Sequence, residues 1–199
     1  MHSPSSFFAS PGMTRDFTPT SNGLHNSRRR GTYVHCMDTW TKTLRSTYTV
    51  TRDDRAIAQV IFSGWGRSAR ASGDGIDWTI ARRGLLHQTV TVRTHDGVTL
   101  ATARGRWSGS YDLTTRDGFT ACFKMTGWCG RYAWVASDGT PLITYKLEKW
   151  YRQNRAIDIR VPVADEALLL VLGGVLAKFT DDDMTATSVA VVAAAAAGA

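Results

Sequence analysis

The sequence predicts a mainly β protein in which a closed antiparallel β-barrel of about 10–12 strands surrounds a central apolar C-terminal α-helix. Three observations predict this fold class. Short segments alternate apolar and polar residues, tight-turn signals recur at intervals of 22, 21 and 21 residues, and one later segment is apolar on every side.

The alternating segments begin near residue 45, end near residue 161 and are rich in Thr, Val, Ile, Tyr and Trp. Ile76, Trp78 and Ile80 share one face of such a segment, and Tyr132 and Trp134 share one face of another. A period of two with β-branched and aromatic residues is typical of a half-buried strand. We therefore expect a succession of short strands over this part of the chain.

The turn signals are Asp-Gly pairs at 74–75, 96–97, 117–118 and 138–139, with an Asp-Asp pair at 53–54 one step earlier. Asp-Gly between alternating segments favours a tight hairpin in which both central residues have positive φ. A second marker runs out of phase with the pairs, since a Trp follows most of them by 11 or 12 residues: Trp65, Trp107, Trp128 and Trp150. Alternation would bury most of these Trp, which would make them core residues.

The repeat is therefore a two-strand unit of about 21 residues that occurs about five times. Two units would also make one propeller blade. The strand region holds fewer than three such blades, and a propeller ring needs about four or more. A single meander that closes into a barrel fits the strand count better.

The all-round apolar segment runs from Ala164 to about Lys178, with Asp165 and Glu166 at its start and a lysine at its end. These charges suit the two ends of a helix dipole. A helix that is apolar on every side must be surrounded, either by lipid or by the barrel. At about 21 Å it is short of the roughly 30 Å hydrocarbon core of a bilayer, so we expect it inside the barrel. There Gly173-Gly174 would let the barrel wall approach closely.

The sequence divides into a disordered leader at 1–40, a barrel domain at 41–179 with its helix at 164–178, and an Ala/Val-rich tail at 180–199. The tail carries Thr185, Thr187 and Ser188 and is mostly weakly hydrophobic Ala, so we expect no transmembrane span. The first residues lack a positively charged start and a continuous apolar stretch, so we expect no secretory signal. Together with an odd number of cysteines, this favours a cytoplasmic protein whose membrane contact, if any, is peripheral.

Three stretches carry a resemblance to a known family: Thr47–Asp54 (TYTVTRDD), Gly118–Lys124 (GFTACFK) and the helix Asp165–Lys178. In this order they resemble the tubby C-terminal-like superfamily, and within it the LURP-one-related and phospholipid-scramblase-like proteins. The resemblance covers about two thirds of the chain. It implies a closed barrel around a central helix and binding of anionic phospholipid, which the tubby branch does through phosphoinositide headgroups. The Cys-rich segment and the acidic calcium-binding stretch of the scramblase branch have no match here.

We expect no metal, no cofactor and no enzymatic activity. Asp181-Asp182-Asp183 is one short run without EF-hand spacing, so helix-capping or solvated carboxylates explain it better than calcium binding. His95-Asp96 has the look of half a catalytic pair, but an adjacent His-Asp at a hairpin usually makes the turn. The sequence has no nucleophile elbow, phosphate-binding Gly loop or zinc-protease motif.

The basic residues offer a binding function. The formal net charge is +7 and the sequence pI is about 9.7, which suits an anionic partner. Six arginines fall near predicted strand ends, where a barrel rim would gather them: Arg67, Arg70, Arg82, Arg83, Arg104 and Arg106. Trp65 or Trp107 would lie beside them and contact headgroups. The alternative is that the arginines are dispersed around the barrel as solubilising charges.

We therefore expect a non-enzymatic binding module for anionic phospholipid or phosphoinositide at a basic barrel rim. Two other functions stay open. A structural or adaptor barrel would bind another protein, and it would carry one exposed apolar patch with dispersed arginines. A nucleic-acid-binding protein, which we consider less expected, would use the same cations on a phosphate backbone with a steep salt dependence.

Overall fold

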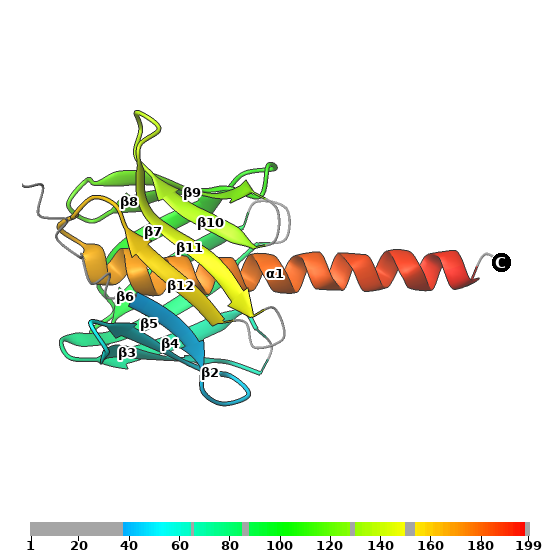
Figure 1. Cartoon of the computed structure of the whole chain (residues 1–199), viewed down its shortest axis with the longest axis horizontal. Coiled ribbons are helices and arrows are strands. Elements are labelled where there is room, and N and C mark those ends of the chain that lie inside the picture. Colours follow the sequence, from blue (N-terminus) through cyan, green and yellow to red (C-terminus); the bar gives the residue numbers. More distant parts are fainter. Residues whose placement is uncertain (1–37, 65, 85–87, 128–129, 150–153, 198–199) are drawn as a thin grey trace, which may run out of the picture. The chain divides into compact units, whose positions relative to one another are not determined.

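The computed structural model describes residues 38–197 except for residues 65, 85–87, 128–129 and 150–153 (Figure 1). The part described forms a closed antiparallel barrel of twelve strands and one helix, which confirms the predicted fold class and excludes the propeller. The strands are β1 (Asp38–Lys42), β2 (Thr47–Arg52), β3 (Arg55–Phe62), β4 (Ser68–Gly73), β5 (Ile76–Arg83), β6 (Thr89–Thr94), β7 (Thr99–Gly105), β8 (Tyr111–Thr115), β9 (Thr120–Gly127), β10 (Arg131–Val135), β11 (Pro141–Lys149) and β12 (Asn154–Ile159). Each strand pairs with its neighbours in sequence, and β12 pairs with β1 to close the ring.

The two ends of the barrel differ chemically, because the number of strands between successive turn signals puts all of these signals at the same end. Because successive Asp-Gly pairs are separated by two strands, all of them lie at one end of an antiparallel barrel, together with Asp53-Asp54. We call this end the turn end. The connections β1–β2, β3–β4, β5–β6, β7–β8, β9–β10 and β11–β12 lie at the opposite end, which we call the exit end.

The backbone of the turns differs in part from the expectation. In all four Asp-Gly pairs only the glycine has positive φ, between 70° and 90°, and the aspartate does not. In three of them the turn is a wider hairpin, as in the loop where Gly97 N donates to Thr94 O (3.0 Å) and Thr94 N donates to Val98 O (2.9 Å). Both central residues have positive φ only at Asp53-Asp54, with φ of 49° and 61°. The pairs therefore make hairpins as predicted, but mostly not the two-residue turn of mirror-image type.

The helix α1 (Glu166–Ala197) enters the barrel at the turn end and leaves it at the exit end (Figure 1). All residues from Leu168 to Ala177 are buried, so the helix forms the core of the barrel as predicted. The predicted end of the helix at residue 178 is wrong, because the helix continues through the segment expected to be a separate tail. Alanine favours the helix, and Lys178 pairs with Asp182 four residues on instead of capping the last turn.

Two adjacent glycines allow the barrel wall to touch the helix backbone, as expected from the sequence. Trp134 Nε1 and Tyr145 Oη donate to the carbonyl of Leu169 at 2.9 and 2.7 Å. A Cβ atom at Gly173 would lie 2.3 Å from that tyrosine hydroxyl, and one at Gly174 would lie 2.2 Å from Cε3 of Trp40. Any larger residue at either position therefore collides with a buried aromatic side chain.

The predicted boundary between leader and barrel at residue 40 is also wrong. Asp38–Trp40 belong to β1, a strand without a turn signal before it, whose pairing with β12 closes the barrel. Only the closed ring gives these residues partners on both sides, and Trp40 is buried there. Residues 1–37 of the expected leader, including Arg28–Arg30, lie outside the described residues.

Candidate functional site

The candidate site is the exit end, where the barrel rim surrounds the emerging helix. Five of the six predicted arginines lie in its loops or in the last residues of the strands that lead to it: Arg67, Arg82, Arg83, Arg104 and Arg106. Arg70 does not belong to this group. It lies in the middle of β4 and pairs across the outer wall with Asp77 of β5 at 3.1 Å. Strand register, which the sequence did not supply, decides this difference.

The five rim arginines differ in what they contact. Arg82 is mostly buried and binds Asp183 of the helix at 2.6 Å, and Arg106 binds Asp112 of β8 at 2.5 Å. Arg67, Arg83 and Arg104 are exposed, and within the described part of the chain they have no ion pair. These three guanidinium groups are available for an external anion.

One rim arginine was missed from the sequence. Arg45 is exposed in the connection between β1 and β2, again without an ion pair among the residues that the structure describes. The repeat in the sequence could have revealed Arg45, because this residue lies between two strands in a connection that alternates with the Asp-Gly turns. The connections that alternate with the Asp-Gly turns carry Arg45, Arg67, Arg106 and Arg152 and no acidic residue at all; the structure of Arg152 lies outside the described residues.

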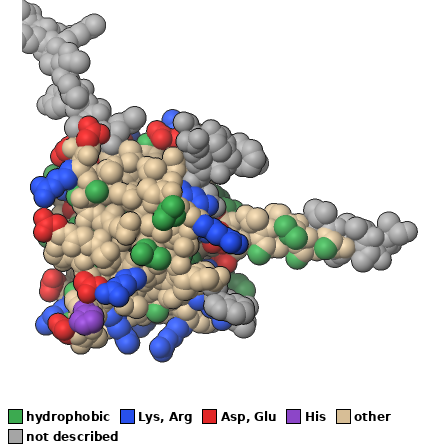
Figure 2. All heavy atoms as spheres, turned by 90° about the horizontal axis from the view of Figure 1, so that it is seen from below, with side chains coloured by type: hydrophobic (Ala, Val, Ile, Leu, Met, Phe, Trp, Pro, Cys, Tyr) green, Lys and Arg blue, Asp and Glu red, His purple; other side chains and the backbone are tan. Residues whose placement is uncertain are grey.

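The turn end has the opposite charge. Its connections carry seven aspartates against two arginines: Asp53, Asp54, Asp74, Asp96, Asp117, Asp138 and Asp165, against Arg116 and Arg160. On the face seen in Figure 2, most acidic side chains lie on the half away from the projecting helix, with basic ones among them, and Lys and Arg side chains lie beside the base of the helix. The barrel therefore has an electric polarity along its axis, with the positive side at the exit end.

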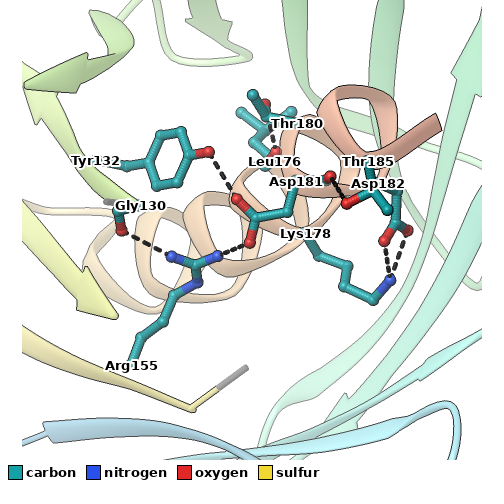
Figure 3. A network of polar contacts seen from close by, with 9 residues as sticks. All are labelled: Gly130, Tyr132, Arg155, Leu176, Lys178, Thr180, Asp181, Asp182 and Thr185. Carbon is teal, nitrogen blue, oxygen red and sulfur yellow. Dashed lines mark hydrogen bonds and ion pairs between the residues drawn. The ribbon is translucent and has the colours of Figure 1, made fainter. Parts of the chain in front are cut away.

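The aspartate run Asp181–Asp183 holds the helix where it leaves the barrel, and Figure 3 shows two of these residues with their partners. Asp181 binds the guanidinium group of Arg155, which is 1% exposed, and accepts a hydrogen bond of 2.8 Å from the hydroxyl of Tyr132. Asp182 accepts a hydrogen bond of 2.6 Å from Lys178. Burial, and then the adjacent Asp181 carboxylate, raise the pKa of the Tyr132 phenol.

The expected role of this run as helix caps is wrong, because the run lies inside the helix. Asp182 and Asp183 are half-exposed, as the alternative of solvated carboxylates expected, but each aspartate also opposes a basic side chain. Arg155 comes from β12 and Arg82 from β5, five strands apart around the ring of twelve. The helix is therefore fixed to nearly opposite sides of the wall. No group of three metal-ligating side chains occurs in the described ranges.

A groove of about 890 Å³ opens beside the helix at the exit end. The connection between β7 and β8 forms one side of it and the helix surface from Thr180 to Val191 forms the other. Its lining combines apolar Trp107 and Met184 with polar Arg106 and Ser188. Such a lining suits an amphipathic molecule.

Exposed apolar side chains concentrate at the same end as the arginines. Among the described residues, the four most exposed large hydrophobic side chains are Leu44 (69%), Trp107 (77%), Val189 (64%) and Val191 (64%). The first two lie in exit-end loops and the other two lie on the projecting helix. The prediction that alternation buries the repeated Trp residues is therefore wrong for Trp107, which lies in a loop and not on a strand. Trp65, Trp128 and Trp150 fall outside the described residues.

Among the residues that the structure describes, no helix is both long and apolar enough to cross a membrane. His95 lies at the turn end, where its Nδ1 is 3.8 Å from Asp77 and its side chain is exposed. It therefore has no part in the exit-end site.

The chain matches no family model, no curated protein and no solved structure. The resemblance to the tubby C-terminal-like superfamily therefore stays a prediction from the sequence.

Proposed function

We propose that the protein is a non-enzymatic binding module that attaches to anionic phospholipid, phosphoinositide included, through the exit end of its barrel. The observation that carries this proposal is the polarity of the barrel, which puts unpaired arginines and exposed apolar side chains at one end and aspartates at the other. An anionic bilayer attracts the first end and repels the second, so the same charges provide both attachment and orientation.

The magnitudes support a reversible attachment. A Lys or Arg near an anionic membrane surface contributes about 1 kcal/mol, so Arg45, Arg67, Arg83 and Arg104 together contribute on the order of 4 kcal/mol. Guanidinium forks also match phosphate oxygens in bidentate geometry. Exposed Trp107 beside them suits the headgroup layer, where aromatic side chains are enriched.

Two observations favour lipid over the alternatives. A nucleic-acid backbone would use the same arginines, but aliphatic side chains such as Leu44 and Val189 make no favourable contact with phosphates. An adaptor barrel was expected to have dispersed arginines, whereas five of the six predicted ones gather at one end. A surface that is both basic and apolar fits the interface of an anionic bilayer best.

Co-sedimentation with vesicles tests the proposal. Vesicles of phosphatidylcholine alone are compared with vesicles that also contain phosphatidylserine or a phosphoinositide. The test variant replaces Arg67, Arg83 and Arg104 with Gln. The control variant replaces the exposed turn-side residues Arg55, Arg93 and Arg116 with Gln, which lowers the net charge by the same three units.

We expect binding to anionic vesicles only, a loss of at least tenfold in the test variant, and a change within about twofold in the control. Equal losses in the two variants would show that overall charge and not the exit end is responsible. Recovery on neutral vesicles equal to that on anionic ones, or no recovery on either, would refute the proposal. A retained shift of short DNA or RNA at physiological salt would favour the nucleic-acid alternative.

A further inference from the structure

We infer that the projecting segment Met184–Ala197 of α1 inserts into one leaflet of the bilayer to which the exit end attaches, without crossing it. This inference rests on the proposed function and adds a second, apolar mode of attachment to the electrostatic one. Every residue from Met184 to Val191 is exposed, although the segment contains no charged residue.

The segment is divided in a way that matches the layers of a bilayer. Its first five residues, Met184–Ser188, contain its three hydroxyl side chains and span about 7.5 Å, close to the depth of a headgroup layer. The following nine residues, 189–197, are only Val and Ala and span about 13.5 Å, just under half of a roughly 30 Å hydrocarbon core. The segment thus has the length to enter one leaflet, and no helix among the described residues is long and apolar enough to cross a membrane.

The side-chain hydroxyls of the segment are already paired within the helix. The hydroxyls of Thr185, Thr187 and Ser188 donate to the carbonyls of Asp181, Asp183 and Met184 at 2.8, 2.9 and 2.9 Å. Helical backbone groups are likewise paired, apart from the carbonyls of the last turn as at any helix end, and internal pairing is the condition for entry into hydrocarbon. Hydroxyls that are paired in this way lose less on leaving water than free ones.

The direction of the helix brings both attachment modes to one surface. The ion pairs of Asp181 with β12 and of Asp183 with β5 fix the helix to the wall at the base of the segment. The exposed arginines stand on the rim around this base, so a bilayer that they contact also meets the segment. Two weak signals together give stable attachment where a single one is marginal.

An environment-sensitive fluorophore measures insertion separately from binding. In a background with Cys36, Cys122 and Cys129 replaced by Ser, the probe is attached at Val191→Cys on the segment. The control places it at Val98→Cys, an exposed site at the turn end. Both proteins are mixed with phosphatidylcholine/phosphatidylserine vesicles, with and without lipids that carry a quencher on the acyl chain, and co-sedimentation is measured in the same samples.

We expect a blue shift and acyl-chain quenching at residue 191 and neither at residue 98. Val189→Asp with Val191→Asp should lower vesicle affinity at least tenfold while circular dichroism shows a folded barrel. Co-sedimentation without any change at residue 191 would overturn the inference and leave the proposed function standing. Absence of co-sedimentation would overturn both. A blue shift without vesicles that rises with protein concentration would show that a second copy covers the segment, and would also overturn the inference.

Discussion

Gly174 provides the sharpest test of the helix-in-barrel core, because two physical effects predict opposite signs for its replacement by Ala. In a helix interior, Ala is favoured over Gly by about 1 kcal/mol, so propensity alone predicts a more stable protein. Packing predicts the reverse. A Cβ at this position would lie 2.2, 2.4 and 2.6 Å from three ring carbons of Trp40, whereas relaxed carbon contacts are about 3.5–4.0 Å.

The ring of Trp40 has little room to move. It is 1% exposed and stacks on Tyr48 with ring centroids 5.2 Å apart, and the closing strand β1 carries it. Overpacking of this kind costs about 1–3 kcal/mol, and we take the upper value because the collision is with a buried ring. After subtraction of the propensity gain, we expect Gly174→Ala to lower the free energy of unfolding by about 2 kcal/mol.

Urea denaturation followed by circular dichroism measures this change, and calorimetry should show a Tm lower by about 4–8 °C. The matched control is Gly64→Ala in the β3–β4 connection, where no atom lies within 4 Å of the added Cβ and φ is not positive. We expect this control to be unchanged or up to about 1 kcal/mol more stable. If Gly174→Ala stabilises the protein as propensity predicts, the close contact between the helix and β1 does not exist.

Three further predictions concern the same core. Leu170→Asp places a charge at a fully buried position and should abolish soluble folding, so a well-folded soluble variant would overturn the architecture. Asp181→Ala leaves the guanidinium of Arg155 buried without its carboxylate partner and should lower the free energy of unfolding by about 3–5 kcal/mol. The double variant Asp181→Leu with Arg155→Met removes both charges and should recover most of this loss in urea denaturation. Equal losses in the two variants would refute the buried pair. Burial raises the phenol pKa of four of the six tyrosines, and stability from a raised pKa is present below the unfolded value near 10 and is lost as the pH rises above it. Absorbance at about 295 nm, which follows tyrosine ionisation, and circular dichroism, which follows unfolding, should therefore change together above about pH 10. Ionisation of all tyrosines without unfolding would contradict the burial of Tyr48, Tyr111, Tyr132 and Tyr145.

The candidate site was only partly predictable. Arg82 and Arg104 could be placed near strand ends because alternation and turn signals are local properties. Arg70 was wrongly included, since a strand of six residues puts it between the two ends. Arg45 was missed because β1, the strand before it, has no turn signal before it and is fixed by its pairing with β12 and β2.

The sequence by itself determined the repeat of strand pairs and the apolar helix that fills the barrel. Both depend on short-range patterns: the period of two, the Asp-Gly turns and the run from Leu168 to Ala177. The tertiary structure alone decided that the ring closes through β1, that the helix continues to Ala197, and that the aspartate run lies inside it. It also decided which arginines stand free at the exit end. The physical reason is that ring closure, strand register and the pairing of Asp181 and Asp183 with β12 and β5 join residues far apart in the chain.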